Sequence, residues 1–256
     1  MNSIKFLGTA GARFVVMKQL RASGGLWLTL DGTQLLVDPG PGSLLHCLSS
    51  RPKLHPQDLE GIILTHRHLD HSNDINIMIE AMTNGGFTKK GVVFAPRDAL
   101  EDDPVILKHA RQQVERIETL KEKGKYQLGT IVFETPKQLK HGVETYGVNF
   151  RGKTCCISLI TDTDYFSDLA SYFTGEILII NVVLKDDKRN IEHLCLNEAE
   201  QIIVENKPKL AILTHFGMGM VKAKPWEIAE NLSKKYGVQI LAAQDGMQID
   251  IDRYTK

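Results

Sequence analysis

The segment Thr65-His66-Arg67-His68-Leu69-Asp70-His71 places four side chains that can bind a metal within six positions. It follows directly on the apolar run Gly61-Ile62-Ile63-Leu64, and a short apolar run that stops at polar residues is typical of a buried strand that delivers a loop. In an extended loop alternate side chains share a face, so His66 and His68 point the same way. Imidazole and carboxylate groups suit zinc, and also manganese or iron. The segment therefore predicts a metal site at the end of a strand.

Three more residues of the ligand type follow other predicted strands. His141 comes after the segment Gln138–Lys140, Asp162 ends the run 157–161, and His215 ends the run 210–214. A lone histidine at the edge of a loop is usually a plain polar residue. Three such residues at the same ends of strands instead converge on one edge of a sheet, which is where open sheets place their sites.

The pattern along the chain indicates two β-rich halves with helices outside them. Apolar runs predict strands over 4–7, 26–30, 34–37, 61–64, 92–95, 130–133, 154–160, 177–183 and 210–213. Helical spacing predicts helices over 75–82, 104–122 with Asp103 as its N-cap, a helix through Val204 capped by the pair Asn197 and Glu200, and 224–236. With no Pro-, Gly- or Ser-rich linker, residues 1–256 are expected to form a single α/β domain, an αββα four-layer sandwich.

Composition narrows the class of partner. The 31 basic and 31 acidic residues give a formal net charge of zero, so there is no whole-protein field to hold nucleic acid. No stretch is apolar and long enough to span a membrane, and four scattered cysteines do not form a disulfide framework, so we expect a cytoplasmic location. We expect a small-molecule substrate, and a homodimer stays open.

Here the motifs resemble those of the metallo-β-lactamase superfamily. The segment Thr65–His71 matches its H-x-H-x-D-H signature, and Leu36-Val37-Asp38-Pro39-Gly40 is similar to its first motif. Within the superfamily the chain looks most like the branch of ribonuclease Z-like and cyclic phosphodiesterases. That likeness rests on the segments 6–11, 141–147, 191–199 and 213–216.

The resemblance implies a site with two divalent metal ions, most simply Zn²⁺, with Mn²⁺ or Fe²⁺ as alternatives. One ion would be held by His66, His68 and His141, the other by Asp70, His71 and His215, with Asp162 bridging them. Asp38 would fix the ligand loop by hydrogen bonds. The metals would activate a water and stabilise the charge that develops on the substrate.

The catalytic candidates are Asp70, whose loss would remove one metal, and His193. Cleavage of a phosphodiester requires a proton for the leaving alkoxide, and His193 stands just before a predicted helix in the segment that resembles the branch's additional catalytic histidine. The alternative is that His193 is an exposed loop residue.

Three basic residues, Arg13, Lys18 and Arg21, either attract an anionic substrate or are solvated.

Three departures from the branch pattern bear on the substrate. Cys195 stands where the branch has Ser or Thr, and Asn181 follows a strand where an acid is usual. Only 20 residues separate His141 from Asp162, which leaves no room for the long arm that grips tRNA. We therefore expect hydrolysis of a small or cyclic, anionic phosphodiester rather than of RNA.

Other functions remain as alternatives. A lactone, thioester or lactam could be cleaved with the same metals and less help from an acid, and a ribonuclease Z-like activity on RNA is a further reading. An iron-based redox protein of this fold tends to carry an acid where this chain has His68. A binding protein with a relic site is disfavoured by the complete set of ligands.

Overall fold

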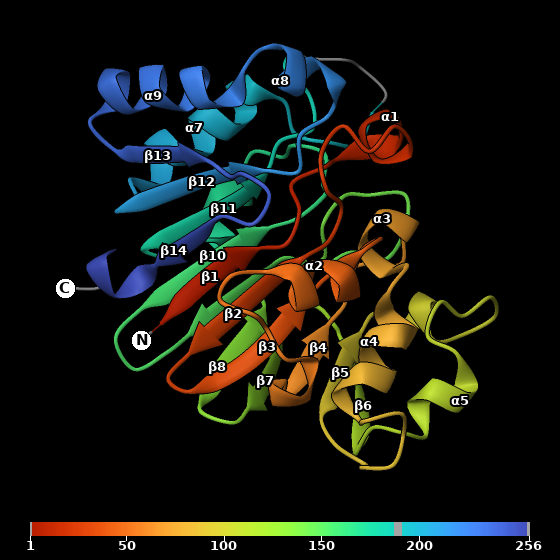
Figure 1. The fold of residues 1–256 in the computed structure, drawn as a ribbon. Coiled ribbons are helices and arrows are strands. Elements are labelled where there is room, and N and C mark those ends of the chain that lie inside the picture. The colour runs from red at the N-terminus through yellow and green to blue at the C-terminus, as the bar shows by residue number, and fades with distance from the viewer. Residues whose placement is uncertain (1, 187–190, 255–256) are drawn as a thin grey trace.

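The strands form two seven-stranded sheets that lie face to face, as seen in the computed structural model, which describes residues 2–186 and 191–254 (Figure 1). The first sheet has the order β14 (Gln248–Asp250), β1 (Ser3–Phe6), β2 (Leu26–Leu30), β3 (Thr33–Val37), β4 (Gly61–Ile63), β5 (Val92–Ala95) and β6 (Arg116–Thr119). The second has the order β13 (Gln239–Ala242), β12 (Leu210–Thr214), β11 (Ile177–Asn181), β10 (Cys156–Ile160), β9 (Val148–Arg151), β8 (Ile131–Thr135) and β7 (Gly124–Leu128).

Both sheets combine an antiparallel half with a parallel half. Strands β14 to β3 pair antiparallel and β3 to β6 pair parallel, while β7 to β10 pair antiparallel and β10 to β13 pair parallel. The parallel strands end at one edge of the molecule, where their following loops meet. This arrangement provides the shared edge that the ligand spacing predicts.

Helices cover the outer face of each sheet, which gives the four layers of an αββα sandwich (Figure 1). The helices associated with the first half are α2 (Ser43–Ser49), α3 (Leu69–Ser72), α4 (Ile75–Met82) and α5 (Lys108–Arg111), with 3₁₀ turns η1 (Pro56–Asp58) and η2 (Arg97–Ala99). The others are α1 (Ala12–Met17), α6 (Leu169–Tyr172), α7 (Leu196–Asn206), α8 (Met218–Lys222), α9 (Pro225–Tyr236) and η3 (Ile251–Tyr254). No helix within the described ranges is apolar and long enough to cross a bilayer.

Alternation along the strands explains the layers. In β3, Leu35 and Val37 point into the apolar core between the sheets, whereas Leu36 packs under the helices of the first half. In β11, Ile179 faces the space between the sheets and Ile180 faces α7. Because these strands are buried on both faces, they read as continuous apolar runs in the sequence.

The prediction of a helix over residues 104–122 is wrong. The chain forms only the short α5 and then turns into β6, which pairs in parallel with β5. The β-branched residues Ile117 and Thr119 suit this edge strand, and pairing with β5 overrides local helix propensity. Asp103 caps no helix, and instead its backbone carbonyl accepts a hydrogen bond from Arg67 at 2.6 Å. The structure also adds β7 and β9, which the apolar runs do not predict.

The capping pair of α7 also differs from the prediction. The helix begins two residues earlier than Asn197 implies, with Cys195 as N-cap, and the Cys195 backbone N–H donates to the Glu198 carboxylate at 2.8 Å. Asn197 is exposed within the first turn. The α7 start matters for the site because it fixes the chain immediately after His193.

We expect Glu198→Ala to lower the free energy of unfolding by about 1 kcal/mol, because it removes the acceptor that satisfies the first free N–H of α7. Asn197→Ala is the matched control and should change stability by less than about 0.5 kcal/mol. Urea unfolding of both variants measures the difference. A larger loss of unfolding free energy for Asn197→Ala than for Glu198→Ala would show that Asn197 is the residue that caps α7.

Candidate metal centre

The chain delivers its ligand-type residues from the ends of parallel strands of both sheets. His66 follows β4, Asp162 follows β10 and His215 follows β12. The prediction that His141 ends a strand is wrong, because β8 stops at Thr135 and His141 lies in the connection to β9. That connection is tied to the first sheet where the Tyr146 backbone N–H donates to the Thr65 carbonyl at 3.1 Å. All seven sequence-predicted ligands therefore meet at one edge.

The first ligand group consists of three histidines. Their ring centroids lie 4.9 Å apart for His66 and His68, 4.8 Å for His68 and His141, and 5.2 Å for His66 and His141. The Nε2 atom of His141 lies 3.1 Å from Nδ1 of His68, and Nε2 of His66 is buried without a hydrogen-bond partner. Three imidazole nitrogens therefore converge on one point, the arrangement that a tetrahedral metal needs.

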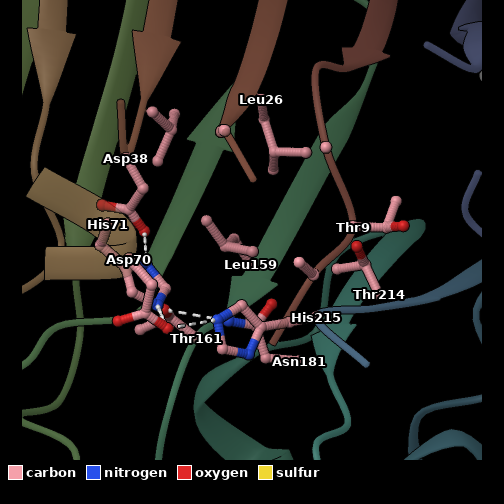
Figure 2. Close-up of a pocket in the computed structure, with 15 residues that line it drawn as sticks. Thr9, Leu26, Asp38, Asp70, His71, Leu159, Thr161, Asn181, Thr214 and His215 are labelled. Atoms are coloured by element: carbon pink, nitrogen blue, oxygen red, sulfur yellow. Dashed lines mark hydrogen bonds and ion pairs between the residues drawn. The ribbon is translucent and has the colours of Figure 1, made fainter. Parts of the chain in front are cut away.

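The second group combines two carboxylates with two imidazoles. His71 Nε2 lies 3.3 Å from Asp162 Oδ2, and His215 Nε2 lies 3.4 Å from Asp70 Oδ2. Figure 2 shows the His215 ring turned toward Asp70 and His71. Asp162 also reaches the first group, because its Oδ2 atom lies 3.8 Å from His66 Nε2. Its carboxylate is 2% exposed and stands between the two groups.

Two of the imidazoles are oriented by hydrogen bonds from Nδ1, the ring nitrogen that faces away from the cluster. His71 Nδ1 donates to Asp38 Oδ2 at 2.9 Å, and His141 Nδ1 donates to the backbone carbonyl of Glu192 at 3.0 Å. A ring nitrogen that donates in this way leaves the opposite nitrogen, here the Nε2 atom facing the cluster, to bind a metal once that atom is free of its proton. The rings are thereby prepared as ligands.

Asp38 makes the contacts that the sequence predicts for it. Its Oδ1 accepts the backbone N–H of Thr65 at 2.7 Å, and its Oδ2 accepts the Thr65 hydroxyl at 2.7 Å. The backbone of Asp38 has a φ of 53°, a left-handed conformation that costs of order 1–3 kcal/mol in a residue other than glycine. One carboxylate thus fixes both the start of the ligand loop and the His71 ring.

Asn181 is a site residue whose role the sequence does not reveal. Its Nδ2 donates to Asp162 Oδ1 at 2.9 Å, and it stands at the end of β11, where the branch pattern has an acidic residue. An amide can donate to an ionised carboxylate, which a second carboxylate could not do. The only signal in the sequence is a polar residue that ends a fully apolar strand.

Buried charge makes the centre selective for a cation. Burial lowers the pKa of His66 well below its usual value, and the neighbouring His71 lowers it further. Burial also opposes charge on His71, but the nearby carboxylates, that of Asp38 most strongly, outweigh burial and hold its pKa well above the usual value. Burial works to raise the pKa of Asp162, yet His215 and His71 hold it well below its usual value. The carboxylates thus stay ionised and demand positive charge.

The ligand set fits a divalent metal ion. Among the described residues, the buried polar atoms without a hydrogen-bond partner include His66 Nε2, His71 Nε2, His193 Nδ1 and both ring nitrogens of His215. A buried polar atom without a partner costs roughly 1–3 kcal/mol, so this many in one place indicate a cluster built to bind something else. Imidazole nitrogens and carboxylate oxygens are what zinc and manganese bind.

His193 lies at the rim of the cluster. Its Nδ1 is 3.7 Å from Asp162 Oδ2, and its ring centroid is 5.1 Å from that of His141. The preceding loop is closed by two backbone hydrogen bonds, from Leu184 N to Leu194 O and from Leu196 N to Leu184 O. Burial lowers the pKa of His193 to about 4, so the imidazole is neutral at pH 7 in the metal-free protein.

The remaining candidates lie apart from the cluster. Of the histidines outside the cluster, His55 and His109 are exposed and His46 is partly exposed. Arg13 and Lys18 are also exposed, whereas Arg21 is half-buried and donates to the Thr9 hydroxyl at 2.8 Å.

Sequence comparison places the whole chain among proteins of one superfamily. A model of the beta-lactamase superfamily domain matches residues 33–216. A protein of Methanocaldococcus jannaschii, described as uncharacterized, is 30% identical over 257 residues, which covers 97% of this chain and 94% of that protein. This level of likeness over the full length indicates common descent of the entire domain.

Solved structures share the fold at low identity. The metallo-beta-lactamase fold protein YhfI of Bacillus subtilis has a TM-score of 0.77 at 18% identity, covering 97% of this chain and 98% of its own. A diphosphatase of the PhnP family has a TM-score of 0.69 at 19% identity, covering 97% and 96%. The short form of human tRNase Z has a TM-score of 0.68 at 19% identity, covering 97% and 99%.

We expect Gly40→Ala to weaken metal binding by about 10–100-fold, because a Cβ at this position would lie 1.9 Å from the Asp70 carbonyl oxygen and would push the ligand helix α3 away. Gly219→Ala is the control, since its Cβ would meet its nearest neighbour, Lys185, at 3.4 Å. The measurement is the metal content of each variant after dialysis against a series of chelators of increasing metal affinity. Equal retention by the two variants would contradict it.

Proposed function

Because the chain belongs to the metallo-β-lactamase superfamily, we propose that it is a metal-dependent hydrolase that cleaves a small or cyclic phosphodiester. The observation that carries this proposal is the shared position of Asp162 between two complete ligand groups. In addition, His193 stands at the rim of the cluster, where a leaving group would depart.

The proposed centre assigns His66, His68 and His141 to one metal and Asp70, His71 and His215 to the other, with Asp162 shared. When bound, two such cations, Zn²⁺ or alternatively Mn²⁺ or Fe²⁺, would supply an activated water and electrostatic stabilisation of the phosphoryl oxygens. Asp38 and the Glu192 carbonyl orient the imidazoles, and Asn181 holds the shared carboxylate.

The proton for the leaving group is assigned to His193. Burial lowers its pKa in the metal-free protein, and a bound phosphodiester anion would favour the protonated imidazolium that can donate to the leaving group. Protonation of the imidazole is thereby coupled to the presence of an anionic substrate. A positioned acid of this kind typically contributes about 10²–10⁴-fold to the rate.

The short segment between His141 and Asp162 and the zero net charge support a small substrate. The segment between His141 and Asp162 is occupied by β9 and β10, which belong to the second sheet and project no arm. Formal net charge is zero, which favours a local anion site over a long polyanion. Two of the similar folds are described as a diphosphatase and a tRNase Z, and both of those names denote phosphorus–oxygen chemistry.

The low pKa of His193 supports a second candidate, the hydrolysis of a carboxyl-type bond such as a lactone, thioester or lactam. Those reactions need less protonation of the leaving group, so a neutral imidazole would not limit them. The two candidates differ in their dependence on His193.

We expect the protein to bind two equivalents of Zn²⁺, and His215→Ala and Asp70→Ala to bind one and lose most hydrolytic activity, because each removes a ligand of the same metal. Elemental analysis of protein equilibrated with buffered zinc measures the stoichiometry. His46→Ala, which alters a histidine outside the cluster, should bind two. Near wild-type turnover with two bound metals in either ligand variant would refute the assignment.

We expect His193→Gln to slow the hydrolysis of an alkyl phosphodiester such as a cyclic nucleotide by about 10²–10⁴-fold while its metal content stays that of the wild type. The loss on bis(p-nitrophenyl) phosphate should be much smaller, since p-nitrophenolate leaves without a proton. Steady-state rates on both substrates separate the roles. Equal losses would indicate substrate binding, and no loss on either would favour the lactone or thioester alternative.

A further inference from the structure

The backbone at His215 is held in an unfavourable conformation. Its φ is 57°, in the left-handed region, which is unfavourable for a residue with a side chain. Such a conformation persists only where the surroundings enforce it. His215 lies directly after β12 and carries the imidazole that faces both Asp70 and Asp162, so whatever enforces this φ also aims the ring.

The connection between β1 and α1 provides that enforcement. Phe216, the residue after His215, is fully buried; its N–H donates to the Thr9 carbonyl at 2.9 Å, and its carbonyl accepts from Gly11 at 3.0 Å. A Cβ on Gly11 would lie 2.1 Å from the His215 carbonyl oxygen, so the two segments approach too closely for any residue larger than glycine at this position. The loop therefore brackets the peptide that follows the ligand.

A carboxylate from the far end of the chain holds this loop in place. Asp245 Oδ1 accepts the Thr9 hydroxyl at 2.6 Å, and Asp245 Oδ2 accepts the backbone N–H of Ala22 at 2.7 Å. Thr9 and Ala22 are the two ends of the excursion that contains α1, and they are also joined by a hydrogen bond from Thr9 N to Ala22 O at 2.9 Å. One side chain thus closes the base of the excursion.

Arg21 completes the network from the other side. Its Nη1 donates to the Thr9 hydroxyl at 2.8 Å and to the Ala243 carbonyl at 3.4 Å, and its guanidinium carbon lies 5.0 Å from the centroid of the Phe216 ring. That position allows a cation–π contact with Phe216. The Thr9 hydroxyl accepts from Arg21 while donating to Asp245, so its two roles are both filled. Arg21 is therefore engaged inside the protein rather than free to attract a substrate.

We propose that Asp245, Thr9 and Arg21 are positioning residues that clamp Phe216 and so set the affinity of the second ligand group, through His215, for its metal. The inference rests on the proposed metal centre. None of the three residues belongs to either ligand group, and their effect is transmitted through the backbone of residues 9–11 and 215–216.

The test is a zinc titration of the full chain, with the affinities of the first and second equivalents resolved by competition with chelators. In Asp245→Ala and in Thr9→Val we expect the second equivalent to bind about 10–100-fold more weakly and the first to be unchanged. Thr9→Ser keeps the hydroxyl and should retain wild-type affinity. This rescue is not expected if the position contributes packing alone.

Asp31→Asn serves as the matched control, because Asp31 also uses its carboxylate to hold a distant backbone N–H, that of Lys153 at 2.6 Å, but in the β2–β3 turn. It should leave both affinities unchanged. Folding is checked by the thermal midpoint of each metal-free variant. If Asp245→Ala does not fold, Arg21→Gln replaces it.

The inference is overturned if folded variants bind both equivalents as the wild type does, or if both equivalents weaken alike. A wild-type protein that binds no zinc in the same titration would refute the proposed metal centre itself. The two failures are therefore distinguishable.

Discussion

The centre depends on a single buried carboxylate. Asp162 is 2% exposed, yet four imidazoles lie within 3.3–3.8 Å of its oxygens, those of His66, His71, His193 and His215. An ionised carboxylate in such a place is tolerable only if positive charge and hydrogen bonds surround it. The donors around it, Asn181 among them, therefore stabilise its ionised form.

Both sheets contribute residues to the surroundings of Asp162. The first contributes the ligand loop and Asp38, and the second contributes Asp162, Asn181 and His215. The cost of the arrangement is visible in the backbone, because both Asp38 and His215 have a left-handed φ. Each strained residue is enclosed by hydrogen bonds from segments remote in the chain, which is how a fold maintains strain at a site.

A second link joins the metal centre to the candidate acid. The Glu192 carbonyl orients His141, and the next residue along the chain is His193. Any displacement of this loop would therefore move His141 and His193 together.

The sequence by itself determined the layered α/β fold, the strands that end at the site, and the gathering of the seven ligand-type residues with Asp38 behind them. Apolar runs that end in ligand-type residues predict the strands and the gathering, whereas the role of Asp38 was implied by the resemblance of its motif to that of the superfamily. Only the tertiary structure decided that residues 104–122 turn into an edge strand, because pairing with β5 outweighs local helix propensity. It also decided the roles of Asn181, the Glu192 carbonyl and Asp245. Their partners lie 19, 51 and 236 residues away, and a backbone carbonyl or a distant hydrogen bond leaves no pattern in a linear sequence.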